Sequence, residues 1–379
     1  MATASGIIFS NIHDKNVPEL TRKRTMASIP YGCRYRLIDF ALSNMVNSGI
    51  TNVGVITHYN YQSLIDHIGS GKDWDLSRRS GGIKILTPYL TSFANSVNML
   101  YNSRLEALMS INYSLSRYTS DVIVFSDCDI ICNIDLNEMI RAHVDSGAEM
   151  TFAVKKVDLT EEDASKNVIF ESDSEGNITD VLSFRSRGIS GPRDVNLNIF
   201  VANTGYIQRV VNDALAHGFK SFHQDVIAPN LKKDKLMVYR YDGYFANIGS
   251  VANYFAHNME LISNPEIRDE LFGTKNRPVY TKVRNSAPTK YGEGAVVKNS
   301  LVADGCIIDG EVENSILFRG VKVGRGTRIK NSILFQDTFT GENVFLNCVI
   351  TDKNVVIRDD RILSGHESMP FFIEKGKMI

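Results

Sequence analysis

Short apolar runs alternate with amphipathic segments over the first two thirds of the chain, from Ser5 to about Tyr254. Apolar runs bounded by polar residues or glycine predict strands, and the amphipathic segments between them predict helices. Strands that alternate with helices form crossover units, which build a mainly parallel sheet covered by helices. The pattern therefore predicts an α/β nucleotide-binding layer. The expected strands are 6–9, 52–57, 83–87, 121–125, 149–155 and 236–241, and the expected early helices are 39–48 and 61–68.

The last quarter of the chain has a different period. Apolar residues return at every sixth position, and an Asn/Ser-apolar element recurs at intervals of 15, 17 and 16 residues. Such spacing, with Gly or Asn at the corners, is typical of a parallel β-helix built from hexapeptide repeats. An antiparallel sandwich of short strands is the alternative, and the regularity of the repeat disfavours it. The four copies are Asn299-Ser300-Leu301-Val302, Asn314-Ser315-Ile316-Leu317, Asn331-Ser332-Ile333-Leu334 and Asn347-Cys348-Val349-Ile350.

Length and pattern together predict two domains joined by a linker. A chain of 379 residues exceeds what one hydrophobic core usually supports, about 250 to 300 residues. The pattern loosens into Asn-Pro, Arg-Pro and charged residues between the two periodic regions. We expect an α/β domain over 1–262, a linker over 263–286 and a β-helix domain over 287–379.

Charge and cysteine usage exclude several classes of protein. The chain has 42 basic and 43 acidic residues, which gives no general attraction to nucleic acid or to an anionic membrane. Its 5 cysteines are odd in number and scattered, unlike a disulfide framework or a zinc pattern. No apolar run approaches the length that spans a bilayer, and the N-terminus lacks the features of a secretory signal. A cytoplasmic location is expected.

Several motifs resemble those of one enzyme family. They are Pro30-Tyr31-Gly32-Cys33-Arg34-Tyr35-Arg36-Leu37-Ile38-Asp39-Phe40, Asn47-Ser48-Gly49-Ile50 and Trp74-Asp75-Leu76-Ser77-Arg78-Arg79. Together with the β-helix pattern, they resemble the ADP-glucose pyrophosphorylase (glucose-1-phosphate adenylyltransferase) family over nearly the whole chain. The resemblance implies a Rossmann-like nucleotidyltransferase domain with a mainly parallel mixed sheet, followed by a left-handed β-helix. It also implies a reaction of ATP with glucose 1-phosphate, with Mg²⁺ as the cofactor of the catalytic relatives.

The phosphate-binding segment departs from the family pattern. The family has a glycine-rich loop after the first strand, but the loop here, Ser10 to Asn16, has no glycine. Backbone N–H groups approach phosphates closely where no Cβ intervenes, so this loop is poorly suited to a triphosphate. The family's Lys-Pro pair falls on Met26-Ala27, which replaces a cation by a thioether. Lys15 is the cation that would have to take over the role of the missing loop arginine.

The metal site is incomplete by the same comparison. One family aspartate matches Asp129, but the second falls on Asn247, in a segment that has also lost its arginine. An amide oxygen brings no charge to Mg²⁺, and hard cations at phosphate sites depend on carboxylates. A harmless polar turn at Asn247 is the alternative interpretation.

Two substrate segments are also altered. The family's small-residue nucleotide segment falls on Ser103-Arg104-Leu105-Glu106-Ala107, so Ser103, Arg104 and Glu106 are expected to crowd the nucleotide. The family's sugar-phosphate lysine falls near Phe184 to Gly188, where Arg185 or Arg187 could supply the charge with a different geometry. A solvated basic loop is an equally good interpretation of that segment.

Basic residues remain at positions away from the reaction centre. By the resemblance, Lys23, Arg24, Arg36 and Lys353 match positions that bind anionic regulators such as sugar bisphosphates. A phosphorylated ligand gains charge-assisted hydrogen bonds from such a group. We expect these four residues to form an effector site.

The sequence thus favours a catalytically impaired, regulatory subunit in bacterial glycogen biosynthesis. Its expected partner is an active ADP-glucose pyrophosphorylase subunit, with which it would form a heterotetramer and which it would modulate allosterically. One alternative is a working adenylyltransferase in which Lys15 and Asp127 rebuild the lost contacts. Another is a stand-alone sugar-phosphate sensor. A hexapeptide-repeat acyltransferase is disfavoured because the β-helix repeats contain no histidine.

Overall fold

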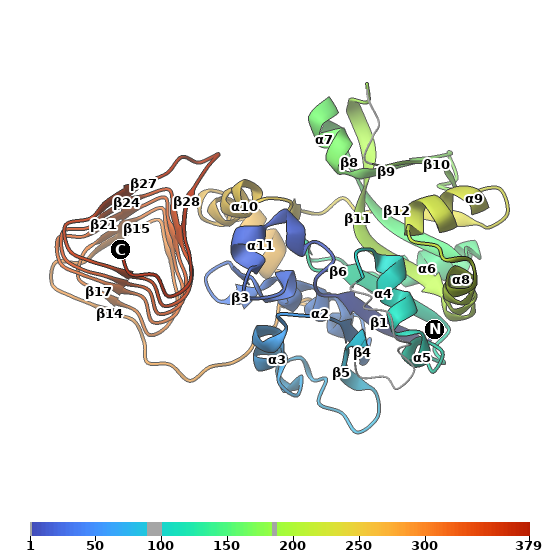
Figure 1. Ribbon diagram of the computed structural model, residues 1–379, viewed down its shortest axis with the longest axis horizontal. Helices are drawn as coiled ribbons and strands as arrows, with labels where there is room; N and C mark the ends of the chain where they lie inside the picture. Colours follow the sequence, from blue (N-terminus) through green and yellow to red (C-terminus); the bar gives the residue numbers. More distant parts are fainter. Residues whose placement is uncertain (1, 89–100, 184–187) are drawn as a thin grey trace. The chain divides into compact units, whose positions relative to one another are not determined.

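The computed structural model describes residues 2–88, 101–183 and 188–379, and the chain divides into two compact units. Unit 1 consists of residues 1–12, 41–61 and 69–243, and unit 2 of residues 13–40, 62–68 and 244–379. Each unit is therefore assembled from separated pieces of the chain. Figure 1 colours these pieces along the sequence.

Unit 1 contains a mixed sheet of nine strands (Figure 1). Its main path runs in the order β10-β9-β11-β6-β1-β4-β5, and β8 pairs with both β11 and β12. The pairs of β1 with β4 and β6, of β4 with β5, and of β8 with β12 are parallel, whereas β11 is antiparallel to β6 and β8. The strands are β1 (Ala4–Phe9), β4 (Asn52–Ile56), β5 (Gly82–Leu86), β6 (Val122–Asp127), β8 (Met150–Leu159), β9 (Val168–Ser172), β10 (Ile178–Ser183), β11 (Gly191–Asn203) and β12 (Leu236–Arg240).

The centre of this sheet is buried on both faces. β6 is buried along its whole length, and β1 is buried from its second residue onward, which explains why these strands read as continuous apolar runs. Phe125, Phe152 and Phe200 pack as a tier of rings, with centroids 4.5 and 5.4 Å apart. The helices with residues in unit 1 are α2 (Leu37–Asn47), α4 (Arg104–Ser110), α5 (Asn112–Leu115), α6 (Leu136–Ser146), α7 (Glu161–Lys166), α8 (Thr204–His217), the π-helix η5 (Phe222–Ile227), α9 (Ala228–Asn230) and the 3-10 helix η3 (Lys72–Trp74).

The first part of unit 2 is made of short elements and two longer helices. The helix α11 lies inside the segment predicted as a linker. It forms there because the Asn264 side chain accepts hydrogen bonds from the N–H groups of Glu266 and Ile267, and Pro265 fits the first turn. The elements are η1 (Asp14–Asn16), α1 (Pro18–Thr21), η2 (Met26–Ser28), β2 (Pro30–Tyr31), β3 (Tyr35–Arg36), α3 (Gln62–Ile68), β13 (Phe245–Asn247), α10 (Val251–Ser263) and α11 (Pro265–Phe272).

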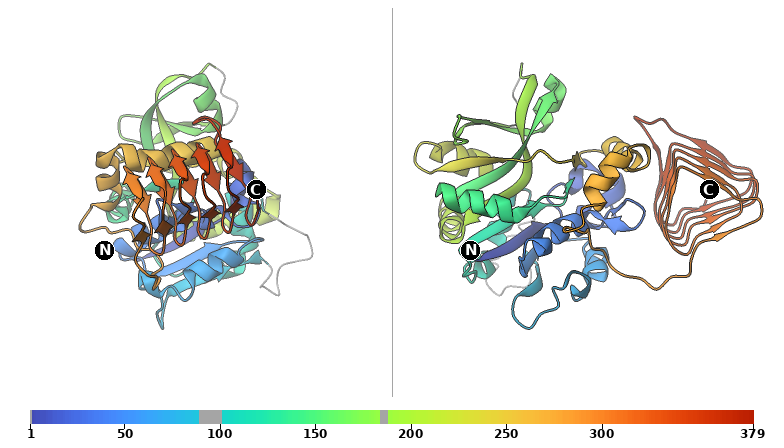
Figure 2. Two further views of the ribbon diagram at one scale, coloured as in Figure 1. Left: turned by 90° about the vertical axis from the view of Figure 1, so that its left-hand side faces the viewer. Right: turned by 180° about the vertical axis from the view of Figure 1, so that it is seen from behind.

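The second part of unit 2 is the predicted β-helix, whose coils are seen along their axis in Figure 1 and from the side in Figure 2. Three parallel sheets of five strands each form its walls. Apolar side chains from every wall, such as Ile308, Ile329 and Leu334, fill the interior. The first wall holds β14 (Lys290–Tyr291), β17 (Ile307–Ile308), β20 (Lys322–Val323), β23 (Phe339–Thr340) and β26 (Val356–Ile357). The second holds β15 (Val296–Lys298), β18 (Glu311–Glu313), β21 (Arg328–Lys330), β24 (Phe345–Asn347) and β27 (Ile362–Ser364). The third holds β16 (Leu301–Val302), β19 (Ile316–Leu317), β22 (Ile333–Leu334), β25 (Val349–Thr351) and β28 (Phe371–Ile373).

The strand register corrects the alignment of the fourth repeat. Ile316 pairs with Ile333, and Ile333 with Ile350, so the corner residues two positions earlier are Asn314, Asn331 and Cys348. The corners at Asn299, Asn314, Asn331 and Cys348 all have left-handed φ angles, between 42° and 52°. Asparagine tolerates that conformation well, which explains its recurrence. The motif put Asn347 at this corner, one residue too early, because the coil is one residue longer than the apparent repeat.

Both predicted layers are thus confirmed, the mainly parallel α/β sheet and the β-helix. Among the residues that the structure describes, none of the helices combines the length and the apolar character that a membrane crossing requires.

Candidate functional site

The sheet of unit 1 has a topological switch point between β1 and β6. From β1 the chain adds β4 and β5 on one side and then returns to place β6 on the other. In open α/β sheets, ligands bind outside the carboxyl ends of the strands at such a point. Phe9 and Asp127, the last residues of β1 and β6, are register partners, so Asp127 and the following Asp129 mark this crevice.

An arginine holds Asp127 in a nearly buried ion pair. The Arg104 Nη2 lies 2.6 Å from Asp127 Oδ2, and its Nε lies 3.1 and 3.0 Å from the two carboxylate oxygens. The side chains are 11% and 1% exposed. Burial by itself lowers the pKa of Arg104, but the attraction of Asp127 and then of Asp129 outweighs it and raises the pKa. Arg104 therefore stays charged beside the Asp127 carboxylate.

The start of α4 explains how Arg104 is positioned. Ser103 Oγ accepts a hydrogen bond from the Glu106 N–H, and Glu106 Oε2 accepts one from the Asn102 N–H. Ser103 also donates to the Lys220 carbonyl at 2.6 Å. The arrangement of Ser103 and Glu106 resembles a capping box, except that the Glu reaches the N–H of the residue before the N-cap, and the two hydrogen bonds fix the first helical turn. Ser103 and Glu106 therefore fix the start of α4, and Arg104 in its first turn points to the crevice.

The second carboxylate of the crevice is bound by an amide. Asn198 Nδ2 donates to Asp129 Oδ2 at 3.1 Å from an irregular point of β11, where Asn198 has a φ of 57°. The ion pair with Arg104 offsets the charge of Asp127. Mg²⁺ at phosphate sites depends on carboxylate charge. Asp127 and Asp129 each offer a carboxylate oxygen, and these lie within 4.8 Å of each other, so a Mg²⁺ ion bound there would have to compete with Arg104 for Asp127.

The start of the loop after β1 is held by side-chain contacts. Asn11 Nδ2 lies 2.7 Å from the nearest His58 ring nitrogen, and Tyr101 Oη donates to Asn11 Oδ1 at 2.6 Å. The rings of His58 and Tyr101 are 4.4 Å apart. The glycine-free loop thus carries near its start a buried asparagine that hydrogen-bonds to side chains.

The other predicted catalytic positions lie elsewhere in the chain. Lys15 is exposed on η1 of unit 2. Met26 is buried in η2, where its N–H donates to Asp14 Oδ1 at 2.7 Å, and burial raises the pKa of Asp14 to about 7. Asn247 ends β13, also in unit 2. Arg185 lies outside the described residues.

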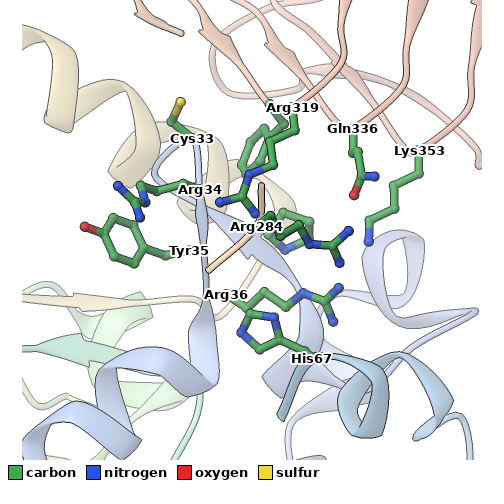
Figure 3. A pocket seen from close by; sticks show the side chains of 11 residues that line it. Cys33, Arg34, Tyr35, Arg36, His67, Arg284, Arg319, Gln336 and Lys353 are labelled. Atoms are coloured by element: carbon green, nitrogen blue, oxygen red, sulfur yellow. The ribbon is translucent and has the colours of Figure 1, made fainter. Parts of the chain in front are cut away.

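Unit 2 has its own cavity, and five basic residues line it (Figure 3). The guanidinium groups of Arg36 and Arg284 and the ammonium group of Lys353 face one space in this view. The cavity is narrow, with a volume of about 30 Å³. We call the five residues the basic cluster: Arg34, Arg36, Arg284, Arg319 and Lys353.

Few acceptors compensate this charge. Arg36 donates to the Ser63 carbonyl and hydroxyl oxygens at 2.5 and 3.0 Å, and Arg319 to Asp304 at 2.9 Å. In the part of the chain that the structure describes, neither the Arg284 guanidinium nor the Lys353 ammonium has an acceptor. Burial and then repulsion from Arg36 and Arg24 lower the pKa of Lys353 to about 7, against the weaker attraction of Asp352. Burial likewise lowers the pKa of Arg36 to about 10. An arrangement of this kind favours the binding of an anion.

The four predicted effector residues have different surroundings. Arg36 and Lys353 line the cavity. Arg24 is buried beside it, with Nη2 at 2.6 and 2.9 Å from the two carboxylate oxygens of Asp352. Lys23 is exposed and does not line the cavity. Arg284 and Arg319 were missed, because the first lies in the predicted linker and the second belongs to no motif.

Lys353 should make the stability of the chain depend on pH. Below pH 7 its ammonium is charged in the folded and unfolded states, so the repulsion destabilises the fold. Between the folded value of about 7 and the ordinary 10.5, the folded state releases the proton and this cost disappears. We expect Lys353→Met to raise the melting temperature at pH 6 by about 2–4 °C, with a smaller rise at pH 9. The exposed Lys322→Met is the control in these melts, and equal shifts of the two variants at both pH values would contradict the assignment.

The fold is that of the nucleotidyl transferase family, combined with a hexapeptide-repeat domain. The family described as nucleotidyl transferase matches residues 15–264, and the GlmU-like C-terminal hexapeptide family matches residues 285–367. The glycogen biosynthesis protein GlgD of Bacillus subtilis is 34% identical over 98% of this chain and 95% of its own length. Glucose-1-phosphate adenylyltransferase of Halalkalibacterium halodurans is 33% identical over 86% of this chain and 83% of its own, and that of Fervidobacterium nodosum is 31% identical over 97% and 87%. The chain belongs to the glucose-1-phosphate adenylyltransferase family, as its motifs predicted.

Proposed function

We propose that this chain is a regulatory, catalytically impaired subunit of ADP-glucose pyrophosphorylase in bacterial glycogen biosynthesis. It would act with an active paralogous subunit that converts ATP and glucose 1-phosphate to ADP-glucose and pyrophosphate. The relative named for glycogen biosynthesis, which aligns over almost the full length of both chains, supports this pathway.

The observation that carries the proposal is the ion pair of Arg104 with Asp127. Phosphoryl transfer depends on positioning and on neutralising charge with metal ions and basic groups. At the switch point of this sheet, a guanidinium of the chain itself pairs with Asp127, the carboxylate that ends β6. A metal and a triphosphate would have to displace that nearly buried pair. This supports impaired catalysis more directly than the loss of glycine from the loop.

The basic cluster supports a regulatory role. Its cations repel one another, so a phosphorylated ligand would relieve the repulsion and accept several charge-assisted hydrogen bonds. The cavity is narrow, but Arg284 and Lys353 have long side chains that can move apart. Binding at this cluster does not need a working active site. A regulatory subunit could therefore sense an effector for its partner.

Regulation would work through a coupling free energy between subunits. An effector that favours one state of the assembly changes the affinity of the partner subunit for its own ligands by some factor. Those ligands in turn change the affinity for the effector by the same factor. Typical coupling of about 1–3 kcal/mol corresponds to about 5- to 150-fold. The flat walls of the β-helix offer surface for such an assembly.

The test is co-expression with the active adenylyltransferase encoded in the same organism. We expect the two chains to purify together, and the mixed assembly to differ from the active chain alone by at least about fivefold in turnover or effector response. The control is Arg284→Ala, which should still purify with the partner but should alter the effector response. Separate purification with unchanged kinetics of the active chain would contradict the proposal.

A stand-alone sensor is the second candidate, and the basic cluster favours it equally. A sensor would be stabilised by a phosphorylated sugar in the absence of any partner and would not change the kinetics of the active chain. Kinetics of the mixture therefore separate the two functions. The rebuilt enzyme is less well supported, because Asp127, which would have to assist Asp129, is paired to Arg104.

A further inference from the structure

Unit 2 has a second cavity of opposite chemical character. It lies between α10 and one edge of the β-helix and has a volume of about 400 Å³. That size falls within the range of small-molecule sites, about 300–1,000 Å³. Two carboxylates, Glu260 and Glu367, belong to its lining, and no lysine or arginine does. A phosphate or another anion would gain no charge-assisted hydrogen bond here.

The β-helix edge of this cavity is a row of corner asparagines. Asn299, Asn314 and Asn331 line it, one from each of three successive coils. The left-handed φ angle of each explains why asparagine occurs at the corner. It does not explain where the side-chain amides find their hydrogen-bond partners.

The ladder of amide hydrogen bonds along these corners is interrupted. Asn299 Nδ2 donates to Asn314 Oδ1 at 2.7 Å, and Asn331 Nδ2 donates to Asn347 Oδ1 at 3.1 Å. Among the described residues, Asn314 Nδ2 and Asn331 Oδ1 have no hydrogen-bond partner. The break thus leaves a donor on one coil and an acceptor on the next, both belonging to residues that line the cavity. A hydroxyl group can accept from the first and donate to the second.

The α10 side completes a surface suited to a sugar ring. Phe255, Met259 and Ile262 supply apolar contact area. Glu260 is fixed by the Tyr244 hydroxyl at 2.7 Å and His257 Nδ1 at 2.9 Å, and the hydrogen bond from His257, more than that from Tyr244, lowers its pKa. A fixed, ionised carboxylate accepts hydrogen bonds from hydroxyl groups. Apolar side chains beside placed polar groups are a usual feature of ligand sites, and here they stand beside a lining richer in polar residues, as a hydroxyl-rich ligand requires.

We propose that the cavity between α10 and the asparagine corners binds a neutral carbohydrate of one or two hexose units. A hydroxyl of the sugar bridges Asn314 and Asn331, Glu260 accepts from a second hydroxyl, and Met259 packs against the C–H groups of the ring. This site is separate from the basic cluster, and none of its lining residues belongs to that cluster. The inference does not depend on whether the chain has catalytic activity.

The test is titration of the full chain with methyl α-glucoside and with maltose, followed by saturation-transfer NMR and calorimetry. Binding with a Kd near 1 mM is the expected result for such a small neutral ligand. Asn314→Asp is the sharpest variant, since it keeps the acceptor for Asn299 and the left-handed corner but removes the donor at the break. We expect it to weaken binding about three- to tenfold. Ala256→Trp, on the exposed side of α10, should fill the cavity and abolish binding.

The control is Asn354→Asp, at an exposed corner with a φ of 58° that does not line the cavity, and it should bind the sugars as the wild type does. Thermal melts verify that each variant is folded. Absence of sugar binding up to about 20 mM, well above a Kd of 1 mM, would overturn the proposal. Sugar binding that survives both Asn314→Asp and Ala256→Trp would also overturn it, because the sugar would then bind elsewhere.

Discussion

Purified alone, the chain will form ADP-glucose at least about 1,000-fold more slowly than an active member of its family under the same conditions. Loss of a single preorganised charge contact in an active site typically costs about 100- to 1,000-fold, and this crevice has lost more than one. Asp127 is paired with Arg104, and the loop that would approach phosphate has near its start a buried Asn11 held by side-chain hydrogen bonds. Release of pyrophosphate from ATP and glucose 1-phosphate with Mg²⁺ is the measurement. Turnover within tenfold of the active enzyme would refute impaired catalysis.

Binding of Mn²⁺ separates the role of Arg104 from other causes of low activity. The wild-type chain should show no tight Mn²⁺ site in electron paramagnetic resonance titrations. Arg104→Gln, which keeps hydrogen-bond donors for Asp127 but removes the charge, should gain one. Arg141→Ala removes an exposed arginine of α6 and serves as the control. A Mn²⁺ site that is equally tight in all three chains would show that Arg104 does not block the carboxylates.

The second large effect is expected at the basic cluster. Inorganic phosphate and fructose 1,6-bisphosphate should raise the melting temperature of the isolated chain, because a ligand that binds only the folded state stabilises it. Arg284→Ala and Lys353→Ala should each weaken binding about 10- to 100-fold, the value of a hydrogen bond to a charged group. Affinity should fall as the pH rises through about 7, where Lys353 loses its proton. Calorimetry at pH 6.5 and 8.5 measures both effects.

Arg325→Ala is the control for this titration, since Arg325 is an exposed arginine of the same β-helix that pairs with Glu342. It should bind both anions as the wild type does. If Arg284→Ala and Arg325→Ala reduce affinity equally, the anions are held by general surface charge, and the basic cluster is not an effector site.

Much of the fold could be predicted from the chain because its signals are periodic. The intervals between Asn299, Asn314 and Asn331 were sufficient to predict the β-helix, since each coil repeats the same corner residue. The fourth corner was misplaced by one residue, because Cys348 occupies a left-handed position that asparagine usually takes. The two discontinuous units could not be predicted, since their boundaries depend on contacts between residues far apart in sequence.

The candidate site was predicted in part. The altered residues at 103–107 were recognised from the sequence, but the role of Ser103 as the N-cap of α4 was overlooked. Ser103 and Glu106 were predicted only to crowd a ligand, whereas their hydrogen bonds fix the start of a helix. The pairing of Arg104 with Asp127 had no local signal, because the two residues are 23 positions apart on different elements. In unit 2, the position of Arg284 in the cavity had no local sequence signal either. A basic residue in an irregular segment cannot be assigned to a cavity until the path of that segment is known.

The buried ion pair of Arg24 and Asp352 has a consequence for how this chain can diverge from its relatives. The two residues are separated by 328 positions, and the Arg24 and Asp352 side chains are 2% and 6% exposed. Removing one partner of such a pair leaves an uncompensated charge, at a cost of about 3–5 kcal/mol, whereas replacing both by apolar residues is often neutral. Substitution of Arg24 is therefore tolerated only when Asp352 is replaced as well. An amino-terminal loop and a late coil of the β-helix are thus constrained to co-evolve.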